Sequence, residues 1–184
     1  MLNDAIKHYF DSINGYEGDQ IDAKKADKHM DGFATLIKSS MAKYFVREKH
    51  KAIISGRLLN KRWDLRFYNS EENNVLEMKS LVLSKMGKCF SNRIEECIGV
   101  AYDIKSVLSH IKLHYFLLIE DDIYENNSVN KKLDKIFDFL YNINHETKLY
   151  HNVCGVLVNK KIEHRFVYND LNHFIAYWKN KNGL

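Results

Sequence analysis

Hydrophobic residues recur along the first half of this chain with two different periods. Steps of three and four residues predict helices over residues 2–13 and 27–45. Alternation with a period of two then predicts three consecutive strands, over residues 52–59, 62–68 and 75–81. The chain therefore begins with helices and continues into a β-hairpin.

Helical spacing returns in the second half. It predicts a long helix over residues 91–110 and another containing Leu133, Ile136 and Phe137. Residues 113–119 are apolar on both faces, which is typical of a central strand. Further strands are expected at 153–158 and 162–167, and a closing helix at 170–179. This order predicts an α/β fold, a mixed central β-sheet flanked by helices on both faces.

Composition supports one ordinary globular domain. The 184 residues are 45% hydrophobic and 28% charged, with no proline, repeat or low-complexity tract, so we expect a single domain over residues 1–184. The apolar runs are far shorter than the ~20 residues that span a bilayer. Asp4 and Lys7 interrupt the start of the chain where a signal peptide would be apolar. We therefore expect a cytoplasmic protein without a membrane segment.

Three cysteines, Cys89, Cys97 and Cys154, form no Cys-x-x-Cys pair, which argues against a zinc site or a disulfide framework. Each is expected to be a small buried hydrophobic residue. The formal charge of +4 is uneven, because residues 43–62 carry seven basic side chains against Glu48 alone. Such a segment could dock a polyanion or be a solvated face, and charge alone does not decide.

An acid-x-Lys pattern occurs four times, but only Glu77-Met-Lys79 lies in a predicted strand. There Glu77 and Lys79 share one face, about 6.6 Å apart along the strand. In the preceding strand, Asp64 and Arg66 alternate with Trp63, Leu65 and Phe67. If the two strands form a hairpin, Asp64 lies beside Glu77, and two adjacent carboxylates require a cation or a proton between them.

Magnesium suits such a pair, because Mg²⁺ takes few protein oxygens and keeps several waters. The metal would lower the pKa of an attacking water and polarise a phosphodiester, and the Met78 carbonyl could complete its shell. Lys79 would orient the water or stabilise charge on the phosphorus. The alternative is a salt-bridged hairpin in which Lys79 only neutralises two acids. Residues 120–122, Glu-Asp-Asp, are a weaker candidate cation site, or a solvated turn.

Several segments together resemble the XhoI-type restriction endonuclease family, which belongs to the PD-(D/E)xK nuclease superfamily. The early segment 28–37 resembles the family's early helix, and FVRE at 45–48 and KRWD at 61–64 resemble the approach to the first catalytic acid. The closest likeness is LEMKS at 76–80, followed at a fixed distance by NRIEE at 92–96. Residues 116–121 resemble a later central strand. Residues 81–86 and the GKCF at 87–90 depart from the amino-acid sequence expected of the family.

The resemblance implies that Asp64 and Glu77 bind the metal and that Lys79 is the catalytic lysine. It also implies a type II restriction endonuclease that makes double-strand cuts at a short palindrome, CTCGAG or a related sequence. A homodimer would read such a two-fold site, and a cognate DNA methyltransferase would protect the host. Because residues 81–90 depart from the family, the target sequence could differ.

Four residues are candidates for reading bases: Lys85, Lys88, Asn92 and Arg93. Arg and Lys can donate to guanine, and Asn can pair with adenine, although each could instead contact phosphate or cap a helix. Glu95 is a possible additional metal-site acid or a helix-surface carboxylate. Two other functions stay open: a repair or structure-specific nuclease of the same superfamily, and a DNA-binding protein without catalysis.

Overall fold

A computed structural model describes residues 1–13, 29–42, 47–70, 72–121 and 127–179. Its main elements follow one another along the chain as α1 (Leu2–Ile13), α3 (Asp31–Met41), β1 (Arg47–Ser55), β2 (Asn60–Tyr68), β3 (Asn73–Val82), α4 (Met86–Val107), β4 (Ile111–Glu120), α5 (Asn127–Tyr141), β5 (Asn152–Val158), β6 (His164–Tyr168) and α6 (Leu171–Lys179). No helix within these ranges is long and apolar enough to cross a membrane.

The six strands form one mixed sheet in the order β1-β2-β3-β4-β5-β6. The central strands β3, β4 and β5 run parallel, and the outer pairs β1–β2, β2–β3 and β5–β6 are antiparallel. Parallel neighbours need crossover connections, which α4 and α5 provide. The expected mixed α/β sheet is therefore confirmed.

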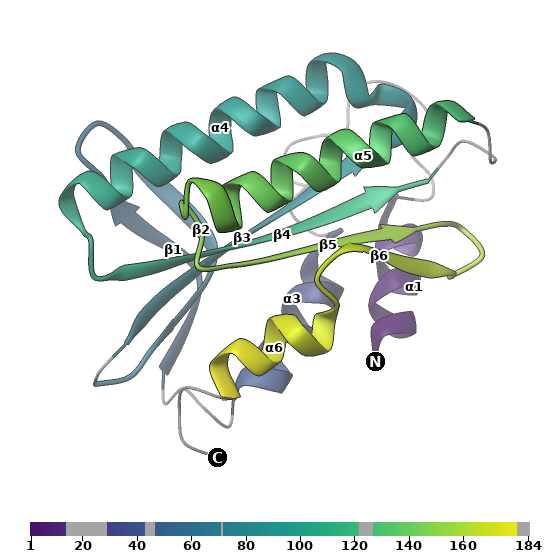
Figure 1. The fold of residues 1–184 in the computed structure, drawn as a ribbon. Coiled ribbons are helices and arrows are strands. Elements are labelled where there is room, and N and C mark those ends of the chain that lie inside the picture. The colour runs from purple at the N-terminus through teal and green to yellow at the C-terminus, as the bar shows by residue number, and fades with distance from the viewer. Residues whose placement is uncertain (14–28, 43–46, 71, 122–126, 180–184) are drawn as a thin grey trace.

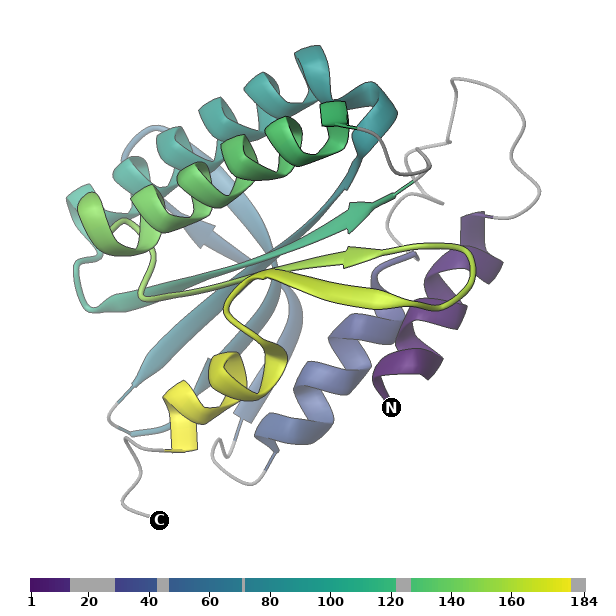
Figure 2. The same ribbon diagram turned by 45° about the vertical axis from the view of Figure 1, so that its right-hand side comes forward.

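Helices cover both faces of the sheet (Figure 1). The two crossovers step in the same direction across the sheet, so connections of the usual right hand place α4 and α5 on one face. The helices α1, α3 and α6 lie on the other face, as both views show (Figures 1 and 2). Each face has its own core, one including Ala101, Ile104 and Leu140, the other Phe33, Ile37 and Phe174.

The predicted element boundaries differ from the observed ones by up to five residues, at β1 and at α4. This helix begins at Met86, five residues before the expected start, and ends at Val107 instead of His110. Met86 and Phe90 are buried and extend the apolar stripe of Cys97 and Ala101 backwards at helical spacing. Phe137 was expected on the apolar face of α5. It is instead 45% exposed, and its ring stacks on the ring of Tyr141. Asp27, the expected start of the second helix, lies outside the described residues.

Candidate active site

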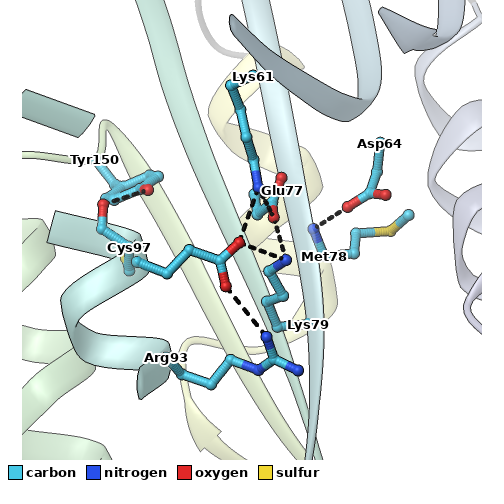
Figure 3. A network of polar contacts seen from close by, with 9 residues as sticks. Lys61, Asp64, Glu77, Met78, Lys79, Arg93, Cys97 and Tyr150 are labelled. Atoms are coloured by element: carbon cyan, nitrogen blue, oxygen red, sulfur yellow. Dashed lines mark hydrogen bonds and ion pairs between the residues drawn. The ribbon is translucent and has the colours of Figure 1, made fainter. Parts of the chain in front are cut away.

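Strands β2 and β3 pair over only part of their length. The ladder joins residues 65–68 to 73–76 and ends at the pair Leu65–Leu76. Beyond this pair the backbone N–H of Met78 donates to Asp64 Oδ2 over 2.7 Å. A side chain thus replaces the next backbone acceptor, and Asp64 lies against the residue between Glu77 and Lys79 (Figure 3).

Strand β2 changes face at Asp64. Trp63 is buried in the core with α4 and α5, whereas Leu65 and Phe67 are buried in the core on the opposite face. The expectation that these three residues share a face is therefore wrong. In β1, Lys51 lies between the partners of Leu65 and Trp63 and has a φ of 52°. The regular pleat is interrupted here, at the point where β2 leaves β3.

Glu77 and Lys79 project from the same face of β3, as alternation predicts. The flanking Leu76 and Met78 pack into the opposite core. Lys79 Nζ lies 2.6 Å from Glu77 Oε1. Glu77 is only 4% exposed, and a carboxylate buried to this degree requires compensating charge.

A second lysine, which the sequence analysis did not assign to the site, reaches the same carboxylate. Lys61, near the start of β2, places Nζ 2.8 Å from Glu77 Oε1 and 3.0 Å from Glu96 Oε1. Lys79 Nζ also lies 3.0 Å from Glu96 Oε1. Two ammonium groups and two carboxylates therefore alternate between β2, β3 and α4 (Figure 3). The only sequence signal for Lys61 was its place in the KRWD segment.

Glu96, and not Glu95, faces this cluster from α4. Arg93 Nη1 donates to Glu96 Oε2 over 3.1 Å, one turn earlier on the helix. Glu95, proposed from the sequence as an additional acid, lies on an exposed face of α4. The rotation of α4 therefore places Glu96, and not Glu95, in the cluster. In the sequence, the three-residue spacing of Arg93 and Glu96 is the pattern that could have indicated an ion pair on one helix face.

Burial and neighbouring charge perturb two of the acids. Burial and the nearby Glu77 carboxylate raise the pKa of Asp64 to about 6, although the Met78 N–H and the two lysines act in the opposite direction. For Glu96, burial raises the pKa, but Lys79 and Lys61 outweigh it and lower the pKa to about 2. The charge of Asp64 is therefore costly in the metal-free protein.

The cluster lines a small, partly open cavity between the sheet and α4. Trp63, Val100 and Tyr115 contribute its apolar wall, and Tyr150 donates from its hydroxyl to the backbone oxygen of Cys97 over 3.0 Å. Burial raises the pKa of Cys97 to about 12, so this thiol stays protonated and is no nucleophile. Cys97 and Cys154 are buried as expected, but Cys89 is exposed, and all three are free.

The residues fit a hydrated divalent cation. Glu77 Oε1 takes both lysines, whereas its Oε2 is buried without a hydrogen-bond partner among the described residues. Asp64 supplies a second carboxylate. In an extended strand the N–H and C=O of one residue point the same way, so the Met78 carbonyl faces the Asp64 side of β3. The described residues contain no group of three or more His, Cys, Asp or Glu that could hold a metal.

The candidate base-reading residues lie at the start of α4, next to the end of β3. Lys85 and Asn92 are exposed there. Arg93 is 38% exposed and held by Glu96. The side chain of Lys88 lies outside the described residues. The structure thus places Lys85 and Asn92 on the surface and Arg93 at the edge of the acidic and basic cluster.

The acidic run after β4 lies apart from this cluster. Glu120 is buried and accepts a hydrogen bond from the Tyr9 hydroxyl over 3.1 Å. Tyr9 belongs to α1, which covers the opposite face of the sheet. Asp122 lies outside the described residues. Glu120 therefore contributes to the packing of α1, and the cation-site alternative for this run gains no support.

The comparisons with known proteins point to one family. A family model described as restriction endonuclease XhoI matches residues 14–169. No curated protein matches significantly. A crystal structure of a protein of unknown function is similar at 10% identity with a TM-score of 0.34, and the match covers 81% of this chain. The chain spans 64% of the length of that solved chain.

Proposed function

Because the chain belongs to the restriction endonuclease XhoI family, we propose that it is a magnesium-dependent type II restriction endonuclease that makes double-strand cuts in DNA. Asp64, Glu77 and Lys79 form the cleavage centre in this proposal. The observation that carries it is the hydrogen bond from Met78 N–H to Asp64. It brings an acid from β2 to the segment of β3 that bears the second acid and the lysine.

Each residue has a distinct role in the reaction. Asp64, Glu77 and the Met78 carbonyl would hold Mg²⁺, and the bound ion would make the attacking water more acidic and polarise the phosphodiester. Lys79 places its ammonium 2.6 Å from Glu77 Oε1, where it can donate to a phosphate oxygen next to the metal. A flexible point charge suits the negative charge that grows on the phosphoryl group during cleavage.

DNA recognition in this proposal uses the start of α4. Lys85, Lys88, Asn92 and Arg93 come shortly after β3 in the chain, Lys85 just before α4 and the other three in its first turns. Lys and Arg can donate to guanine O6 and N7, and Asn can pair with adenine N6 and N7. The basic β1–β2 hairpin, with Arg57 and Arg62 exposed, adds sequence-independent attraction for phosphate.

The proposed substrate is a short palindrome, CTCGAG or a related sequence, read by a homodimer. A two-fold DNA site is matched most simply by a two-fold protein that presents one cleavage centre to each strand. The enzyme would act in the cytoplasm, where a cognate DNA methyltransferase protects the host sites. These finer points rest on the family and not on contacts within this chain.

The test is cleavage of plasmid DNA by the purified protein, followed by sequencing of the ends. With Mg²⁺ we expect discrete fragments with a common end sequence, and no cleavage in EDTA. Lys79→Ala and Asp64→Ala should bind the same DNA without cutting it. Discrete fragments from the Lys79→Ala protein would refute the catalytic assignment.

The same experiment separates the alternatives. A repair or structure-specific nuclease would cut branched or single-stranded DNA and leave intact duplex without defined fragments. A DNA-binding protein without catalysis would bind equally well with and without Mg²⁺ and cut at no protein concentration. Either result would replace the restriction function.

A further inference from the structure

Lys61 occupies a position that the proposed catalytic roles do not use. Its ammonium lies between two carboxylates, 2.8 Å from Glu77 Oε1 and 3.0 Å from Glu96 Oε1, and its side chain is 17% exposed. Lys61 thus already has a second acceptor within reach besides Glu77.

The charges of the cluster are balanced before any cation binds. Glu77 and Glu96 form ion pairs with three basic residues, Lys61, Lys79 and Arg93, and Asp64 adds a third acid close enough for Lys79 and Lys61 to act on its pKa. A divalent cation at Glu77 Oε2 adds two positive charges next to the ammonium groups on Oε1. In a partly buried cavity such like charges repel far more strongly than in water.

The repulsion acts differently on the two lysines. Lys79 lies two residues from Glu77 on the same strand, and its ammonium is the closer of the two to Glu77 Oε1, at 2.6 Å. Lys61 comes from the part of β2 that has separated from β3, and its four-carbon side chain already contacts Glu96. Moving Lys61 away from Glu77 therefore breaks no strand pairing with β3 and retains one ion pair.

We propose that Lys61 is an internal competitor for the cation: its ammonium neutralises Glu77 in the metal-free protein and moves fully to Glu96 when a divalent cation binds. The inference rests on the proposed cation site and deepens it. Lys61 is then a positioning residue that keeps the buried acids paired until metal arrives, and Glu96 is the acceptor that receives it.

The test is the affinity for Mn²⁺ alone, measured by isothermal titration calorimetry without DNA. Removing the competing charge in Lys61→Gln should lower the Kd for Mn²⁺ by about tenfold, a conservative figure for one unit charge a few ångströms away in a partly buried site. Lys61→Arg keeps the charge and should bind like the wild type. An unchanged or higher Kd in Lys61→Gln would overturn the proposal.

A matched control comes from the start of β4. Lys112 is also partly buried and paired with a glutamate, Glu72, so Lys112→Gln removes a similar pair without touching the cluster. Its Kd for Mn²⁺ should equal that of the wild type. If Lys61→Gln does not fold, as judged by circular dichroism, Lys61→Met provides the uncharged side chain for the same measurement, with the same expected and overturning results.

Glu96 gives a second, independent readout. Glu96→Gln removes the acceptor, so Lys61 stays on Glu77 and the Kd for Mn²⁺ should rise. In a Lys61→Gln background the same substitution should have a much smaller effect, because the competing ammonium is already gone. Equal weakening in both backgrounds would identify Glu96 as a direct ligand and overturn its role as acceptor.

These experiments distinguish a failure of the proposed role of Lys61 from a failure of the proposed nuclease function. If the wild type binds Mn²⁺, Glu77→Gln abolishes binding and no DNA is cut, the nuclease function fails while the affinities still decide the role of Lys61. If the protein cuts DNA and Lys61→Gln leaves the affinity unchanged, the competitor role fails and the nuclease stands.

Discussion

Asp64 accepts a hydrogen bond from the backbone N–H of Met78, 2.7 Å away, at the point where the β2–β3 ladder has ended. This contact ties an acid on one strand to the residue between an acid and a lysine on the next. Burial, the largest cause, and the Glu77 charge raise the pKa of Asp64 to about 6. The environment of Asp64 therefore disfavours its negative charge as long as no metal is bound.

This cost predicts a pH-dependent gain in stability for Asp64→Asn. Folded Asp64 keeps its proton up to about pH 6, whereas the unfolded residue loses it near 3.8. The folded state therefore binds more protons in this window, and stability falls as the pH rises through it. In EDTA, Asp64→Asn should raise the free energy of unfolding by about 1–3 kcal/mol at pH 8, with the gain vanishing below about pH 4.

Denaturant unfolding at both pH values measures this difference. Asn can still accept the hydrogen bond from Met78, so the substitution removes mainly the charge. Asp134→Asn, on an exposed position of α5, is the control and should change little at either pH. A destabilised Asp64→Asn protein at pH 8 would show that the carboxylate is compensated in the metal-free fold.

Glu96 and Glu95 form a natural matched pair. Glu96 contacts Lys61, Lys79 and Arg93, whereas Glu95 lies on an exposed face of the same helix. Glu96→Gln leaves three basic side chains without this carboxylate and should slow DNA cleavage by about tenfold or more, an effect of roughly 1.4 kcal/mol on the barrier. Glu95→Gln should cleave at the wild-type rate. Equal rates for both variants in single-turnover assays would contradict the assignment.

Lys85 and Asn92 are expected to contribute differently to DNA binding. If Lys85 contacts phosphate, Lys85→Ala should weaken binding to all sequences and reduce the slope of log affinity against log salt by about one. If Asn92 reads a base, Asn92→Ala should cost about 1–3 kcal/mol on the cognate site only. Fluorescence anisotropy with cognate and scrambled duplexes over a salt series measures both effects. Exchanged behaviour of the two variants would reverse the assignments.

Asp103 connects the β1–β2 hairpin to α4. Its two carboxylate oxygens accept hydrogen bonds from Leu58 N–H and Leu59 N–H at 2.7 and 3.0 Å. Asp103→Ala should lower the free energy of unfolding by about 1–2 kcal/mol, because two backbone donors at the hairpin tip lose a charged acceptor. Thermal unfolding of this variant beside Asp138→Ala, an exposed acid on α5, tests the contact. A loss no greater than that of the control would mean that the hairpin tip is held elsewhere.

The order and kind of the elements can be predicted from local patterns in the chain. Helical spacing and strand alternation are local properties of the chain, so the α/β architecture and the shared face of Glu77 and Lys79 followed from them. The resemblance to the family was also visible in the chain, in the LEMKS and NRIEE segments, and the family model confirms it.

How these elements complete the site depends on their packing in three dimensions. The change of face between Trp63 and Leu65 breaks the alternation on which strand prediction depends, so no local pattern in the sequence predicts it. Lys61 and Glu96 are 35 residues apart and meet only because α4 crosses back over the sheet. Which of two adjacent glutamates faces a lysine depends on the rotation of a packed helix, and that rotation is fixed by the burial of Cys97 and Ala101 in the core.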